Sequence, residues 1–288
     1  MQVVDLTDEH MRFVALCTHT DELNEERESA AGVRETWLRD TLAKGLRVKV
    51  VVENGRPVGF AHCLPIELGT WGMSGKDLMT VPCLTLEHQR IYRQEMGSGC
   101  GRALMEAVEV KARKEKRGVA VLAYDHDSWF MPAAFFEHLG YEKVVRQGSA
   151  VVMLKRFEPV DAPVMHRLRY RPQLVPGKVT VDAFWNPICL TSIVEIHRVR
   201  EVCAEYGDRV ILNEFSCGVV HILERYQTSR ALLFNGRPKC WGYEAPRNEL
   251  RKEIDAALTS GLDAGTGAAG TRGSPAGSEP GEEPARRG

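Results

Sequence analysis

A glycine-rich stretch at Met96–Arg102, with the sequence MGSGCGR, constrains this 288-residue chain more than any other feature. The apolar segment Leu78–Leu86, typical of a strand, precedes it, and apolar residues at i, i+3 and i+4 spacing follow it, which indicates a helix. Glycines permit a tight turn and let a ligand approach the backbone without a Cβ in the way. Amides at the start of a helix, at the positive end of its dipole, bind anions. The order strand, glycine turn and helix therefore predicts a phosphate-binding site.

The common phosphate-binding signatures do not fit this stretch. No Lys-Ser or Lys-Thr pair follows the glycines, as a P-loop requires. Gly97, Gly99 and Gly101 lack the spacing of the dinucleotide-binding fingerprint, which would also follow the first strand of its unit. By itself the glycine pattern is a weak signal, because a flexible loop or an uncapped helix start has it too.

The residues after the glycine turn continue a regular order of elements. A lysine- and arginine-rich turn is expected to end the helix, with Gly118 directly after it. Val119–Tyr124 predicts a buried strand, and Pro132 predicts the start of a further helix that ends at Gly140. A last pair of strands is expected across Tyr141–Phe157.

This order and two motifs resemble the GNAT superfamily of acetyl-CoA-dependent N-acetyltransferases. Met96–Gly101 is similar to the family's acetyl-CoA motif, [Q/R]-x-x-G-x-[G/A], at both glycines, and Ala134–Val144 resembles its A-x-x-F-Y-E-K-L-G-F motif. The resemblance covers residues 1–157 and implies an α/β (α+β) fold with a mixed central sheet. Met96 stands where the family usually has Arg or Gln, and Phe136 stands where a tyrosine often acts as general acid.

The resemblance implies a site for acetyl-CoA as cosubstrate. Main-chain groups of Leu84, Thr85 and Leu86 would pair with the pantetheine arm as an added strand does. The pyrophosphate would lie on the glycine turn and the first helical residues, which are Met96, Gly97, Ser98, Gly99, Cys100, Gly101 and Arg102. The Arg102 guanidinium can add charge-assisted contacts to the phosphate oxygens.

Acetyl transfer to an amine needs a group that removes the amine's proton near neutral pH. Glu87, directly after the apolar strand, is the first candidate, and Glu67 is another; a solvated loop charge is the alternative for both. Tyr141 and Tyr124 are candidates for the acid that Phe136 cannot supply, and the alternative for both is a packed aromatic side chain.

The composition is that of an ordinary globular protein, with 43% hydrophobic and 27% charged residues. A net charge of −1 gives no reason to expect binding to nucleic acid or to an anionic membrane. No apolar run has the length of a membrane span, and no signal peptide is evident, so a cytoplasmic protein is expected. The eight cysteines are scattered without metal-binding spacing, which predicts reduced thiols and no metal site.

The second half of the chain predicts a separate unit. A proline- and glycine-rich stretch at 158–177 predicts a linker or a wrapping segment after the domain of 1–157. Residues 178–258 predict the order β-α-β-α-β-β-α, which is the order of a thioredoxin-like fold. The segment 259–288 is rich in Gly, Ala, Ser, Pro and Glu and cannot offset the entropy of ordering, so a disordered tail is expected.

Trp185–Cys189 lies where thioredoxin-like folds carry C-P-x-C, at the turn from the first strand to the first helix. Asn186 replaces the first cysteine, which removes dithiol exchange. Cys189 remains at the start of a helix, where it is either a sensing thiol or an inert packed one. The combination with the first domain resembles bacterial proteins that carry a C-terminal YoaP-like domain.

The resemblance implies an enzyme that transfers acetyl from acetyl-CoA to a primary amine of a small molecule or peptide by direct attack. Two alternatives are open: an acyl-CoA-binding regulatory protein with impaired catalysis, and an acetyltransferase governed by a thiol-sensing C-terminal domain. The acceptor's identity and the oligomeric state, a homodimer included, cannot be derived from the sequence.

Overall fold

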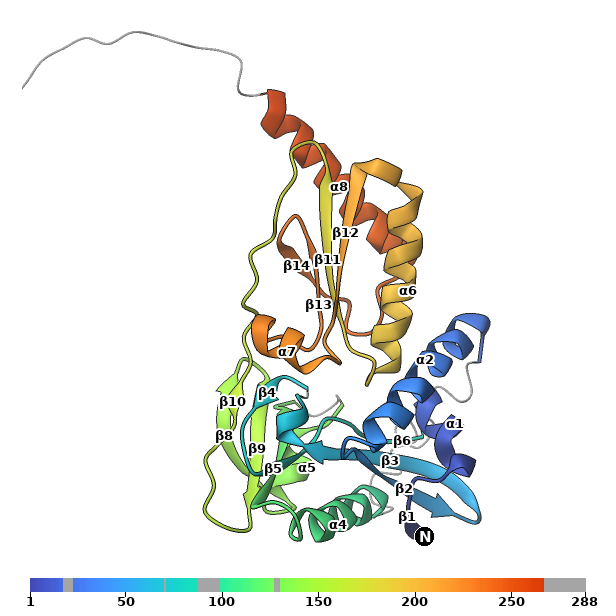
Figure 1. The fold of residues 1–288 in the computed structure, drawn as a ribbon, viewed down its shortest axis with the longest axis vertical. Coiled ribbons are helices and arrows are strands. Elements are labelled where there is room, and N and C mark those ends of the chain that lie inside the picture. The colour runs from blue at the N-terminus through green and yellow to red at the C-terminus, as the bar shows by residue number, and fades with distance from the viewer. Residues whose placement is uncertain (18–22, 70, 88–98, 127–129, 267–288) are drawn as a thin grey trace, which may run out of the picture.

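The computed structural model describes residues 1–17, 23–69, 71–87, 99–126 and 130–266, with side chains up to residue 260. The N-terminal half (residues 1–157) and the C-terminal half (residues 178–266) lie one above the other in Figure 1. Among the described residues, no helix combines the length and the apolar character needed to cross a membrane.

A mixed sheet forms the centre of the N-terminal half, as expected. Its strand order in the described part is β1-β2-β3-β5-β7-β9-β8, with β6 also paired to β3. The strands are β1 (Gln2–Asp5), β2 (Arg47–Glu53), β3 (Arg56–Pro65), β5 (Leu78–Val81), β6 (Leu84–Leu86), β7 (Gly118–Tyr124), β8 (Glu142–Gln147) and β9 (Ala150–Arg156). The other elements are α1 (Asp8–Leu16), α2 (Glu25–Leu42), η1 (Ile66–Leu68), β4 (Met73–Ser74), α4 (Cys100–Ala112) and α5 (Ala133–Glu137).

Helices cover both faces of this sheet, and alternation along β3 sorts its side chains between them. Phe60 and Leu64 join the core cluster that contains α1 and α2. Ala61 and Cys63 join the cluster that contains α4 and α5. The β2–β3 hairpin turns at Asn54, whose φ is +51°, and the following glycine at +76°, which is the backbone that an Asn-Gly hairpin turn predicts.

Gly118 does not end α4, contrary to the expectation from the sequence. The helix stops at Ala112, and Gly118 is the first residue of β7. A Cβ at this position would lie 2.7 Å from the Lys155 carbonyl oxygen on the neighbouring strand. The glycine is therefore required by close packing of the sheet, which sequence spacing alone does not reveal.

The C-terminal half follows the predicted order β-α-β-α-β-β-α. Its sheet order is β12-β11-β13-β14, in which β11 and β12 are parallel and the other neighbours antiparallel. The elements are β11 (Val179–Trp185), α6 (Leu190–Glu205), η2 (Gly207–Arg209), β12 (Val210–Ser216), α7 (Val220–Tyr226), β13 (Ala231–Phe234), β14 (Arg237–Lys239) and α8 (Arg247–Thr266). Because α8 continues to Thr266, the predicted start of disorder at residue 259 is wrong. Residues 267–288 lie outside the described part.

The segment 158–177 contacts both halves instead of acting as a free spacer. Its strand β10 (Val164–Met165) pairs with β4 of the N-terminal half. The Tyr170 hydroxyl donates a hydrogen bond of 2.7 Å to Asp182 on β11, and its ring packs edge-on against Phe184. The segment therefore packs against both halves of the described structure.

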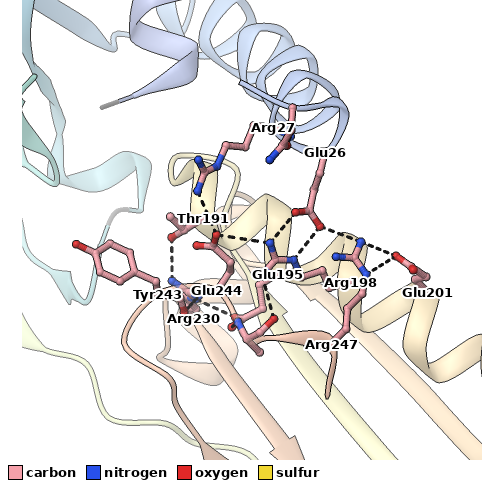
Figure 2. A network of polar contacts seen from close by, with 12 residues as sticks. Glu26, Arg27, Thr191, Glu195, Arg198, Glu201, Arg230, Tyr243, Glu244 and Arg247 are labelled. Atoms are coloured by element: carbon pink, nitrogen blue, oxygen red, sulfur yellow. Dashed lines mark hydrogen bonds and ion pairs between the residues drawn. The ribbon is translucent and has the colours of Figure 1, made fainter. Parts of the chain in front are cut away.

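The two halves share a hydrophobic core and a network of charges. Leu190, Ile193 and Val194 on α6 belong to the core cluster of α1 and α2. Beside them, Arg198 donates two hydrogen bonds, of 2.8 and 2.6 Å, to the carboxylate of Glu26 on α2 (Figure 2). The hydrogen bond from Arg198 holds the pKa of Glu26 below its usual value. The C-terminal half is thus docked on the α1–α2 face of the first sheet.

Candidate active site

Two neighbouring strands part near the middle of the N-terminal sheet. β5 pairs with β7 in parallel as far as Val81, which lies opposite Val121. Pro82 and Cys83 end this pairing, and β6 then pairs with β3, while β7 continues beside β9 as far as Tyr124. We call the gap in pairing between β6 and β7 the strand opening.

The hydrogen-bond register shows which main-chain groups face the strand opening. The His62 amide donates to the Cys83 carbonyl, and the Glu87 amide donates to the Val58 carbonyl, each at 2.9 Å. In an antiparallel pair the residues alternate between bonding the partner strand and pointing away from it. The main-chain groups of Leu84 and Leu86 therefore point into the opening, and those of Thr85 bond to β3.

Helix α4 packs against β6 and begins at the predicted glycine turn. Gly99 is its N-cap with a φ of +77°, and no described atom lies within 4 Å of the position that a Cβ would occupy there. Cys100 is buried in the core, where its thiol donates to Glu53 Oε1 at 3.2 Å, as expected for a residue that fills space beneath the helix. Arg102 is exposed on the first turn. Met96, Gly97 and Ser98 lie outside the described residues.

Glu87 follows β6 directly and continues its register. Its side chain is partly exposed, and alternation places it on the same face as Thr85 and Cys83. Glu67 instead forms an ion pair with Lys116, at 2.9 Å, and accepts the Asp77 amide, so it has a structural role away from the opening. Of the two carboxylates, Glu87 is therefore the one adjacent to the opening.

Tyr141 is a core residue, and its position argues against the predicted role as general acid. Its side chain is 3% exposed and packs edge-on against Phe136 in the cluster beneath α4. Burial, followed by the nearby Glu109 carboxylate, raises the pKa of the Tyr141 hydroxyl, which makes it a weaker proton donor.

Tyr124 is the better placed of the two tyrosines. It is the last residue of β7, at the strand opening, and is partly exposed. Burial also raises its pKa, while a hydrogen bond with Trp71 acts in the opposite direction. Its hydroxyl lies within electrostatic range of two thiols of the C-terminal half, Cys189 and Cys240.

The start of α6 reaches the same region from the C-terminal half. Cys189 is the N-cap of α6, as predicted, and its thiol lies 3.2 Å from the Thr191 hydroxyl. Cys83, directly before β6, hydrogen-bonds with Cys17 and lies within electrostatic range of Cys189; the Cys17 contact and then burial raise the pKa of the Cys83 thiol. Within the described residues, no group of His, Cys, Asp or Glu side chains is arranged to hold a metal ion.

Sequence reasoning missed Arg34, which lies in the middle of the buried stripe of α2 with none of its surface exposed. Its Nη1 donates to the carbonyls of Val14, at 2.5 Å, and Ala15, at 3.1 Å, at the end of α1. Its Nε donates to the Ile188 carbonyl at 3.0 Å, just before α6. Its Nη2 has no hydrogen-bond partner among the described residues. The only signal in the sequence is a charged residue at a core position of a helix.

His62 on β3 is a second fully buried polar residue next to Arg34. Neither ring nitrogen has a hydrogen-bond partner within the described part of the chain. Its ring lies 5.1 Å from the ring of Phe60, over which the Arg34 guanidinium also lies, at 5.6 Å. Burial, and then the Arg34 charge, hold the pKa of His62 well below its usual value, so its imidazole is neutral.

A cavity of about 600 Å³ lies between the C-terminal part of α2 and the loops that precede α6 and α7. Trp37 of α2 lines it on one side, and the loop Asn186–Ile188 lines it on the other. Two of these residues also lie against Arg34 and His62, which we call the Arg34–His62 pair. The Trp37 ring lies 6.4 Å from the His62 ring, and the Ile188 carbonyl accepts the hydrogen bond from Arg34. Arg34 and His62 are not among the residues that line the cavity, and Trp37 and Ile188 lie between them and it.

No protein-family model and no curated protein match this chain. Among solved structures, it is similar to PaiA N-acetyltransferase from Thermoplasma acidophilum in complex with coenzyme A, at 13% identity and a TM-score of 0.38 over 54% of this chain and 99% of that one. It is also similar to a GNAT family acetyltransferase from Brucella melitensis in complex with acetyl-CoA, at 17% identity and a TM-score of 0.37 over 56% of this chain and 90% of that one. A third similar structure is that of aminoglycoside 6'-acetyltransferase type Ii, at 16% identity and a TM-score of 0.39 over 56% of this chain and 100% of that one. These matches lie over the N-terminal half of the chain.

Proposed function

We propose that this chain is an acetyl-CoA-dependent N-acetyltransferase of the GNAT type, which acetylates a primary amine of a small molecule or peptide. The strand opening beside the start of α4 is the observation that carries this proposal. The pantetheine arm is an extended chain with amide groups, so it can pair with the main-chain groups of Leu84 and Leu86 that face the opening, as an added strand does. The pyrophosphate then lies at the amides from Gly97 to Arg102, where a helix start favours an anion.

The reaction we propose is direct attack of the amine on the thioester. The amine nitrogen forms a bond to the carbonyl carbon, the carbon–sulfur bond breaks, and coenzyme A leaves as a thiolate. Glu87 takes the proton from the amine, directly or through water. Tyr124, at the opposite edge of the opening, replaces the predicted Tyr141 as the donor of a proton to the thiolate.

For the C-terminal half we propose a thioredoxin-like unit over residues 178–258 that has no dithiol chemistry. The sheet order β12-β11-β13-β14 and the directions of its strands support this architecture. Asn186 is 4% exposed and holds the loop before α6, because its Oδ1 accepts from the Ile188 amide and its Nδ2 donates to the Cys217 carbonyl. This unit covers the face of the first sheet from which an acceptor would approach.

Calorimetry with acetyl-CoA on the full chain tests the proposal. Gly99→Trp fills the open space before α4 and is expected to weaken binding by about tenfold or more. Gly148→Trp is the matched control, because Gly148 also has a positive φ, of +60°, and open space around it, but lies in the β8–β9 turn. Both variants carry the same backbone strain, so only a site at α4 separates them. Absence of binding by the native chain, or equal affinities of the two variants, would overturn the proposal.

A further inference from the structure

The Arg34–His62 pair leaves donors unsatisfied where the fold offers no acceptor. Arg34 bonds three carbonyl oxygens, but no ion pair between described residues includes it. A guanidinium removed from water is costly unless a charge of opposite sign or full hydrogen bonding offsets it. Within the described residues, Arg34 Nη2 and both ring nitrogens of His62 have no hydrogen-bond partner. Such a cluster fits a ligand that brings oxygen acceptors and a negative charge.

The position of the Arg34–His62 pair, near the strand opening and the start of α6, indicates which anionic ligand it binds. Arg34 lies within electrostatic range of Cys83, the residue that directly precedes β6 at the strand opening. It also bonds Ile188, one residue before the N-cap of α6, so the positive end of this 16-residue helix lies beside it. Cys83 and Cys189 are both partly exposed, whereas Arg34 and His62 are fully buried. An anion held here would lie next to the thioester end of the proposed acetyl-CoA site.

We propose that Arg34, with His62 beside it, binds the carboxylate of the acetyl acceptor, so that the acceptor is an amino acid or a closely related amine with its own carboxylate. The inference rests on the proposed function and specifies its substrate class. The carboxylate accepts from Arg34 Nη2, and the amine of the same molecule is then held toward the thioester at the strand opening. The cavity beyond Trp37 and Ile188 leaves room for the acceptor's side chain.

The test compares matched acceptors with the full chain and acetyl-CoA. Each amino acid is paired with its amide, for example leucine with leucinamide, and kcat/KM is measured at one pH. The amide's amine loses its proton more readily than that of the acid, so chemistry alone favours the amide. We expect the acids to be preferred by about tenfold or more, because an amide leaves the buried guanidinium without a counter-charge. Equal or better turnover of the amides would overturn the inference and leave the acetyltransferase proposal intact.

Two variants separate this role from a structural one. Arg34→Gln is expected to remove most of the preference for acids, through KM more than kcat. Arg198→Gln, at the same α2–α6 interface but already paired with Glu26, is expected to keep it. If Arg34→Gln does not fold, the acid–amide comparison in the native chain still decides. A folded Arg34→Gln enzyme with unchanged preference would overturn the inference, and a native chain that neither binds acetyl-CoA nor turns over any amine would overturn the proposed function itself.

Discussion

Arg34, which is fully buried, and Arg230, which is partly buried, lie on either side of the start of α6 and are neutralised in different ways. Arg230, in the C-terminal half, donates from its three nitrogens to Glu195, to the Thr191 hydroxyl and to the Tyr243 carbonyl (Figure 2). Arg34, in the N-terminal half, hydrogen-bonds only to carbonyl oxygens among the described residues, and its Nη2 has no partner there. The first arrangement is complete without a ligand and stabilises the fold. The second is incomplete, which is the state expected of a binding group.

The largest effect is expected from breaking the complete arrangement. Arg230→Met leaves the Glu195 carboxylate, 8% exposed, without its counter-charge, which should lower the free energy of unfolding by about 3 kcal/mol. Arg34→Met leaves only carbonyl acceptors behind, so it should lower the free energy of unfolding by less. Urea unfolding of both variants measures the difference. If Arg34→Met proved the more damaging, the contrast between the two arginines would be wrong.

Measuring the free energy of unfolding against pH extends the comparison to two histidines, His62 beside Arg34 and His197 on α6. The unfolded chain protonates His62 near pH 6.5, whereas the folded protein does not, so stability is lost as the pH falls below 6.5. The loss should be about 2 kcal/mol between pH 6.5 and 5 and absent in His62→Leu. His197→Gln is the control, because the Glu26 and Glu214 charges offset part of the lowering of the His197 pKa. A His62→Leu variant with the native pH profile would contradict this expectation.

The two edges of β6 differ in the same way, since one bonds to the neighbouring strand β3 and the other faces the strand opening. Leu84→Pro removes an amide that faces the strand opening, so acetyl-CoA affinity should fall by about tenfold while stability changes little. Thr85→Pro removes an amide that bonds to β3, so it should lower the unfolding free energy instead. Calorimetry and thermal unfolding of the two variants distinguish these outcomes. Similar behaviour of both would mean that the register of β6 has no bearing on binding.

The smallest effect is expected at the partly exposed ion pair between the halves. Glu26→Gln should cost about 1 kcal/mol at neutral pH, because solvent screens the pair with Arg198. The pKa of Glu26 is lowered in the folded protein, so this contribution is present above its unfolded value of about 4.5 and is lost as the pH falls. The unfolding curves of the native chain and the variant should therefore converge at acidic pH, and a constant difference would exclude the ion pair as its cause.

The sequence predicted those parts of the site that depend on neighbours in the chain. The glycine turn before α4 and the strand before it carry their own signals, since a helix start and a strand are set by local spacing. The sequence could not rank Tyr141 and Tyr124 as candidates for the general acid, because only packing separates a core ring from one at the opening. Gly118 was misread for the same reason, since its close neighbour is Lys155 on another strand.

What the sequence alone determined is the succession of helices and strands from the strand before α4 to β9 and in the C-terminal half, together with the glycine at which α4 begins, because periodicity and turn residues act over a few residues. Tertiary structure decided where the sheet opens and what surrounds the opening. Arg34 contacts Ile188, 154 residues away in the chain, and that contact places a buried cation, a neutral histidine and the start of a helix from the other half together. No local sequence pattern predicts that these groups lie together, because their proximity depends on how two folded units pack.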